Sequence, residues 1–136
     1  MLKSVTARDY MATNLITFTP DMDVLEAVEW LLDYQISGAP VVDEQHQLIG
    51  VLSERDCLQT VLSAAYHDDL GATVGELMTA QVDTVEADTS IVELAEMFLK
   101  SNRRLYPVVE EGRLVGQISR RDVLKAFERF VNPKAK

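Results

Sequence analysis

The chain has 136 residues, 47% of them apolar and 26% charged, which suits one soluble globular domain or two smaller units sharing a core. Its formal net charge of −9 argues against nucleic acid or an anionic membrane surface as a partner, because both require a basic face. No apolar run approaches the roughly 20 residues needed to cross a bilayer, and the N-terminus lacks the apolar segment of a signal peptide. Cys57 is the only cysteine, which excludes an internal disulfide and favours a cytoplasmic location.

The sequence contains an internal repeat. A shift of 67 residues aligns Met11 with Met78, together with many of the residues that follow them. After a deletion of one residue in the second copy, residues 50–56 (GVLSERD) align with residues 116–122 (GQISRRD). A tandem duplication of this kind predicts two copies of one folding unit.

Each copy predicts the element order β-α-β-β-α. A short strand comes first, and apolar residues at helical spacing follow it. Two strands joined by a polar loop come next, and a second amphipathic helix closes the copy. The first copy has predicted strands at 15–18, 39–42 and 48–52 and helices around 24–32 and 57–62, and the second has strands at 82–85, 105–109 and 114–118 and helices around 91–99 and 123–130.

The predicted fold class is α/β (α+β), with two β-α-β-β-α units at residues 5–66 and 74–130 and a linker at 67–73. A unit of about 60 residues buries little surface and would be only marginally stable alone. We therefore expect the two units to pack on each other about a pseudo-twofold axis. The apolar helix faces that remain suggest a further dimer.

These residues resemble a known family. The pattern Met-x-x-x-Leu-Ile-Thr, then Pro-Val-Val, then Gly-Val-Leu-Ser-x-x-Asp looks like tandem CBS domains, the Bateman module, and the likeness runs from about Val5 to Phe130. The resemblance implies a regulatory module that binds adenosine-containing ligands (AMP, ADP, ATP or S-adenosylmethionine) in clefts between the repeats and transmits binding to a partner protein. It also implies a disc-shaped homodimer. It leaves no room for a catalytic domain, so we do not expect an enzyme.

By this resemblance, Asp56 and Asp122 accept hydrogen bonds from ribose hydroxyls, as an ionised carboxylate can. The helix N-terminus that follows each strand would attract a phosphate. The remaining positions would lie near the base, the sugar or the phosphate, with the alanine, tyrosine and prolines as walls of a purine slot. The predicted ligand-binding residues are Thr17, Ala39, Pro40, Ser53, Arg55, Asp56, Thr84, Arg104, Tyr106, Pro107, Ser119, Arg120, Arg121 and Asp122.

The same Ser-x-x-Asp pattern has a structural interpretation. A serine at the N-cap with an acid three residues later forms a capping box, which satisfies free backbone amides at a helix start. The motif alone leaves capping and ribose binding open.

We expect the two clefts to differ. Arg103-Arg104 and Arg120-Arg121 surround the second motif, whereas Ile36-Ser37 and Glu54 stand at the matching places around the first. Our hypothesis is that the arginine-rich cleft takes the phosphate-bearing ligand and the other is weaker or empty. The alternative is a solvated face with salt bridges.

No cofactor or metal ion is required by the sequence. The two histidines have no partners at metal-ligand spacing. A magnesium ion could accompany a nucleotide, although no residue pattern demands it. The alternative function is a structural or protein-interaction dimer with degenerate ligand sites.

Overall fold

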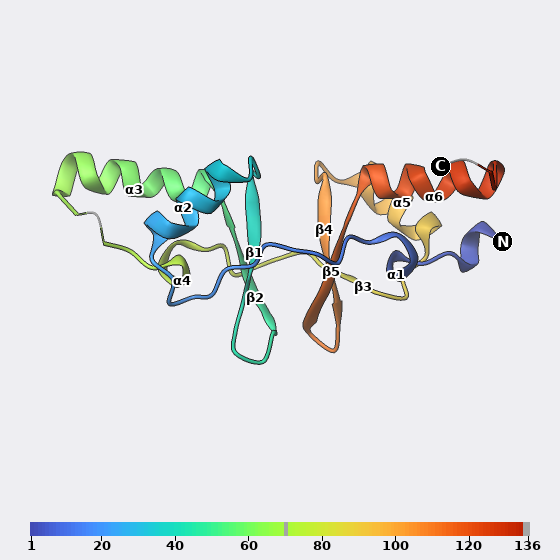
Figure 1. Cartoon of the computed structure of the whole chain (residues 1–136), viewed down its shortest axis with the longest axis horizontal. Helices are drawn as coiled ribbons and strands as arrows, with labels where there is room; N and C mark the ends of the chain where they lie inside the picture. The colour runs from blue at the N-terminus through green and yellow to red at the C-terminus, as the bar shows by residue number, and fades with distance from the viewer. Residues whose placement is uncertain (70, 135–136) are drawn as a thin grey trace. The chain divides into compact units, whose positions relative to one another are not determined.

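A computed structural model describes residues 1–69 and 71–134 (Figure 1). The elements are η1 (Leu2–Ser4), α1 (Ala7–Tyr10), α2 (Val24–Asp33), β1 (Gly38–Val42), β2 (Leu48–Ser53), α3 (Glu54–His67), α4 (Val74–Leu77), β3 (Val85–Glu86), α5 (Ile91–Lys100), β4 (Leu105–Glu110), β5 (Arg113–Ser119) and α6 (Arg120–Val131). The structure confirms a mixed α+β fold with two β-α-β-β-α-like units, although the sequence does not predict η1, α1 and α4, and no strand precedes α2 among the described residues.

The chain forms two compact units, and their boundaries differ from those of the sequence repeats. One unit, which we call the first unit, is Ile16–Val82, and the second unit combines Met1–Leu15 with Asp83–Lys136. The segment before the first strand of each copy therefore joins the unit built mainly from the other copy. Each unit has its own apolar core.

The first unit is built on an antiparallel hairpin of β1 and β2. Helix α3 packs against α2 and β2 (Figure 1). Phe18 and Leu52 are among the buried side chains that form the core of this unit. The strand predicted at 15–18 is wrong in extent, because only Phe18 bridges to Val41 of β1. Two backbone hydrogen bonds hold it: the Phe18 amide donates to the Pro40 carbonyl, and the Val42 amide donates to the Phe18 carbonyl, each at 2.9 Å.

The second unit has a sheet in the order β3-β4-β5, with β3 parallel and β5 antiparallel to β4. The strand predicted at 82–85 lies further along the chain, at Val85–Glu86, because Val85 is the first residue that pairs with β4. Helices α5 and α6 pack together beside the hairpin of β4 and β5 (Figure 1). The two hairpins share a register irregularity, at Val41/Val42 and at Val108/Val109.

Candidate functional site

The first strand-to-helix corner lies where β2 ends and α3 begins. The Ser53 amide donates a hydrogen bond to Asp56 Oδ2 (2.9 Å), and the Asp56 amide donates to Ser53 Oγ (3.1 Å). The Thr79 hydroxyl, from the segment after α4, donates to Asp56 Oδ1 (3.2 Å) and lies 3.5 Å from Oδ2. Both carboxylate oxygens of Asp56 therefore have a donor within the first unit.

The second corner lies where β5 ends and α6 begins. The Ser119 amide donates to Asp122 Oδ2 (2.9 Å), and the Asp122 amide donates to Ser119 Oγ (3.2 Å). The Ser119 hydroxyl lies 3.0 Å from the same Oδ2. Within residues 1–69 and 71–134, no donor reaches Asp122 Oδ1, so this carboxylate keeps one acceptor oxygen available.

Both corners are capping boxes, which confirms the structural interpretation of the Ser-x-x-Asp pattern. Capping does not exclude ligand binding, because it occupies one oxygen of each carboxylate. The two aspartates are half-buried, so a ligand could reach them from solvent.

The strand register brings the other predicted residues of the first unit to its corner. Ala39 pairs with Leu52, and Pro40 pairs with Val51, which is two residues before Ser53. Both β1 residues are buried, and Thr17 is half-buried beside Phe18. Arg55, in the first turn of α3, is exposed.

In the second unit, Tyr106 and Pro107 are buried in β4. The Tyr106 ring lies 4.9 Å from the Phe98 ring, between centroids, and its hydroxyl is 3.0 Å from Ser101 Oγ. This side chain, 3% exposed, therefore packs in the core. Thr84 is exposed just before β3.

The four arginines near the second corner divide into engaged and free side chains. Arg103 contacts Asp83 Oδ2 through Nη2 (2.8 Å) and Nε (2.9 Å), and Arg120 Nε donates to the Arg103 carbonyl (3.0 Å). In the part of the chain that the structure describes, the guanidinium groups of Arg104 and Arg121 have no hydrogen-bond or ion-pair partner. Both side chains are exposed, and both are available to an anion.

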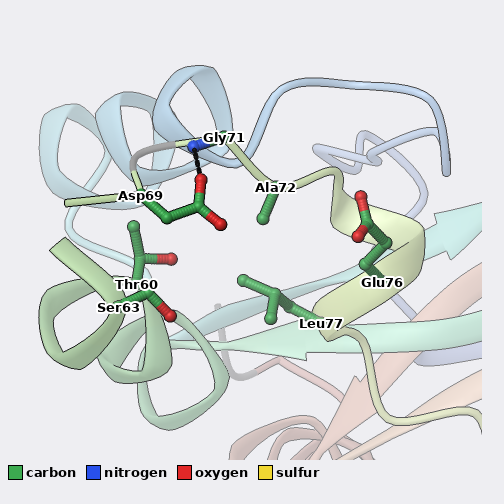
Figure 2. Close-up of a pocket in the computed structure, with 7 residues that line it drawn as sticks. All are labelled: Thr60, Ser63, Asp69, Gly71, Ala72, Glu76 and Leu77. Atoms are coloured by element: carbon green, nitrogen blue, oxygen red, sulfur yellow. Dashed lines mark hydrogen bonds between the residues drawn. The ribbon is translucent and has the colours of Figure 1, made fainter. Parts of the chain in front are cut away.

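Two pockets in the described part of the chain are lined by residues other than the two corner aspartates. A pocket of about 500 Å³ between α5 and α6 has Arg120 as its one predicted site residue. A second pocket, of about 220 Å³, lies between α3 and the segment leading into α4, where the Asp69 carboxylate accepts a hydrogen bond from the Gly71 amide (3.0 Å; Figure 2). Its lining residues are Thr60, Ser63, Asp69, Gly71, Ala72, Glu76 and Leu77.

Thr79 is the residue of the first corner that the sequence analysis missed. The repeat alignment contains the signal, because Met78-Thr79 aligns with Met11-Ala12. The alignment does not say that this side chain reaches Asp56, which lies 23 residues away in the sequence.

Three further features of the described residues limit the chemistry or the setting of the protein. The described residues contain no group of three or more histidine, cysteine, aspartate or glutamate side chains placed to hold a metal ion. No helix among them is long and apolar enough to span a bilayer. Burial, followed by the charges of Asp56 and Glu54, raises the pKa of the Cys57 thiol, so this group is a poor nucleophile at neutral pH.

The sequence matches the CBS domain family twice, over residues 7–63 and 74–129. It is 36% identical over 117 residues to the inosine-5′-monophosphate dehydrogenase of Aquifex aeolicus, a match that covers 85% of this chain and 23% of the enzyme. The chain spans between 23% and 41% of the length of three curated relatives that it matches.

Solved structures of CBS pairs have the same fold. The crystal structure of CBSX2 of Arabidopsis thaliana in complex with AMP has a TM-score of 0.79 and 28% identity, covering 94% of this chain and 99% of that one. The CBS pair of MJ0100, in complex with 5′-methylthioadenosine and S-adenosyl-L-methionine, has a TM-score of 0.69 and 27% identity, covering 90% of this chain and 95% of that one. This chain therefore belongs to the CBS-domain family, as a tandem CBS pair.

Proposed function

We propose that this CBS pair is a regulatory module that senses an adenosine-containing nucleotide and transmits binding to a partner protein. The observation that carries the proposal is the second corner, where Asp122 presents an unused carboxylate oxygen beside the N-terminus of α6. The AMP and S-adenosyl-L-methionine complexes of CBSX2 and MJ0100 support the ligand class.

Asp122 would accept a hydrogen bond from a ribose hydroxyl through Oδ1 while its Oδ2 continues to cap α6. A hydrogen bond to a charged group contributes about 1.5–3 kcal/mol, whereas loss of a helix cap costs about 1 kcal/mol. The ligand can therefore also recruit Oδ2 if its second hydroxyl reaches it. Either arrangement favours binding.

The phosphate would lie near the first turn of α6. The helix dipole favours an anion there, and Arg104 and Arg121 have exposed guanidinium groups without protein partners among the placed residues. Arg103 is less suited, because Asp83 already binds it at 2.8 Å. The proposed phosphate ligands are thus Arg104 and Arg121. Magnesium could accompany the phosphates, although no residue pattern demands it.

The module would act without a reaction of its own. A ligand changes the state of a protein only when it binds two conformations with different affinity. We propose that nucleotide binding at the corner favours one conformation of the CBS pair and that the partner protein distinguishes the two. The partner is unidentified.

A homodimer is part of the proposal. Helices α3 and α6 each present apolar side chains at helical spacing that are at least 48% exposed, an arrangement that suits burial against a second copy. These side chains are Leu58, Val61, Leu62 and Tyr66 on α3 and Leu124, Phe127, Phe130 and Val131 on α6.

The same apolar faces support a second candidate function, a structural or interaction dimer whose ligand sites are degenerate. The capping boxes favour it to the extent that both aspartates already have hydrogen-bonding roles without a ligand.

A thermal-shift panel with AMP, ATP and S-adenosylmethionine separates the two functions. A ligand that binds only the folded state must raise the melting temperature of the protein. At a free ligand concentration of 100 times Kd, the folded state gains about 2.7 kcal/mol of stability. Stabilisation by one or more of these compounds, absent with guanosine monophosphate as the control, would support sensing. No shift at millimolar concentration would favour the structural module.

A further inference from the structure

The two corners share one backbone framework. The segment before α3 or α6 pairs with a short extended segment in the same way in each unit: Thr79 bridges antiparallel to Val51, and Ala12 bridges antiparallel to Gln117. The paired amide-to-carbonyl distances are 2.9 and 2.9 Å in the first unit and 2.8 and 2.9 Å in the second. Thr79 and Ala12 therefore occupy equivalent places.

The side chains at these equivalent places differ by one hydroxyl. The Thr79 hydroxyl donates to Asp56 Oδ1 at 3.2 Å, on the carboxylate oxygen that the capping box leaves unused. Ala12 has no polar side-chain atom, and no other described residue donates to the matching oxygen of Asp122. Both carboxylate oxygens of Asp56 accept hydrogen bonds from the protein, whereas only Oδ2 of Asp122 does so among the described residues.

From this difference we infer that the residue after the repeated methionine, Thr79 or Ala12, sets which corner binds the ligand ribose. The inference rests on the proposed function and deepens it. At the first corner a ribose hydroxyl must compete with the Thr79 hydroxyl for Asp56. At the second it meets an oxygen to which no described residue donates a hydrogen bond.

This selection is separate from the one that the arginines provide. The arginines act on the phosphate, so they alter the affinity for AMP relative to adenosine. A hydroxyl at position 79 or 12 acts on the ribose contact, so it alters the affinity for AMP and for adenosine alike. Loss of one charge-assisted hydrogen bond to the ligand should raise Kd on the order of tenfold.

Isothermal titration calorimetry of the full chain with AMP and with adenosine tests the inference. Ala12→Thr supplies the competing hydroxyl at the second corner and should weaken the principal binding event about tenfold for both compounds. Ala80→Thr adds the same hydroxyl one position further along the other segment, at an exposed residue, and serves as the matched control. The melting temperature without ligand checks that each variant folds.

The reciprocal change is Thr79→Val, which keeps the shape of the side chain and removes the hydroxyl. It should strengthen binding at the first corner about tenfold, seen as a second event or a higher stoichiometry per chain. Thr79→Ser, which keeps the hydroxyl, should behave as the parent. Unchanged AMP affinity in Ala12→Thr together with unchanged stoichiometry in Thr79→Val would overturn the inference while leaving the proposed function intact. Failure of the parent chain to bind AMP, adenosine, ATP and S-adenosylmethionine would overturn the proposed function itself.

Discussion

The side chain of Met11 packs directly over Gly116, and a Cβ atom built on that glycine would lie 2.5 Å from Met11 Sδ and 2.8 Å from the Ala12 carbonyl oxygen. The first unit repeats the arrangement with Met78 over Gly50, where the matching distances to Sδ and to the Thr79 carbonyl are 2.7 and 2.9 Å. This close approach fixes the extended segment against the sheet and places residue 12 or 79 beside the corner aspartate. Each corner therefore depends on a glycine at this position, Gly50 or Gly116, because a side chain there would collide with the extended segment.

Gly116→Ala should destabilise the chain by about 1–3 kcal/mol, because the added methyl group overlaps a backbone carbonyl as well as the flexible methionine. Urea unfolding followed by circular dichroism measures the change. Gly71→Ala is the control, since the nearest atom to its Cβ would be 3.7 Å away, and it should alter stability by no more than about 0.5 kcal/mol. Equal stability of the two variants would contradict the role assigned to Gly116.

The capping boxes predict a local stability effect that needs no ligand. Ser53→Ala and Ser119→Ala should each lower the free energy of unfolding by about 1 kcal/mol, because each removes the side-chain acceptor for an amide in the first helical turn. Ser37→Ala, at an exposed serine outside the helices, is the matched control. If either serine can be replaced without lowering the free energy of unfolding, the capping box at that corner does not stabilise the protein measurably.

The free acceptor on Asp122 predicts unequal effects of the two aspartates on nucleotide binding. Asp122→Asn should weaken AMP binding about tenfold or more, since the ribose loses a charged acceptor, whereas Asp56→Asn should have a smaller effect. The amide replacement keeps the shape and an acceptor oxygen for the cap. Calorimetry that finds equal losses in the two variants would remove the proposed asymmetry.

Arg121 predicts a phosphate-specific effect. Arg121→Ala should lower the affinity for AMP roughly threefold to tenfold and leave the affinity for adenosine unchanged, because only AMP carries the anion. Lys125→Ala is a close control, since Lys125 is a cationic residue of the same helix, is likewise exposed, and is not among the predicted ligand-binding residues. A parallel loss for AMP and adenosine would assign Arg121 to something other than the phosphate.

The raised pKa of Cys57 predicts the reactivity and the pH response of its thiol. Because burial and two neighbouring carboxylates disfavour the thiolate, native protein should react with iodoacetamide far more slowly than urea-unfolded protein.

The contribution of the Cys57 thiol to the free energy of unfolding is fully present below the ordinary thiol pKa of 9.0. It is lost as the pH rises through the higher pKa of the folded state. Unfolding curves of the parent and Cys57→Ala, compared across that range, measure it: only the parent should show this component of alkaline destabilisation.

The sequence by itself determined the duplication, the order of helices and strands, the capping boxes and the membership of the CBS family. Each depends on contacts between near neighbours or on a repeated pattern, as when Ser53 and Asp56 meet three residues apart across one helical turn. The strand at 15–18 was overestimated, because propensity does not say how many backbone hydrogen bonds a neighbouring strand can offer.

Only the tertiary structure decided which segment joins which compact unit, and hence which side chain meets each corner aspartate. Thr79 reaches Asp56 across 23 residues of sequence, and Ala12 reaches the second corner from the opposite end of the chain. Tyr106, which we predict to lie beside the ligand, packs against Phe98. The physical reason is the same in all three cases: a contact between distant residues is selected by the packing of whole elements, which the local sequence does not encode.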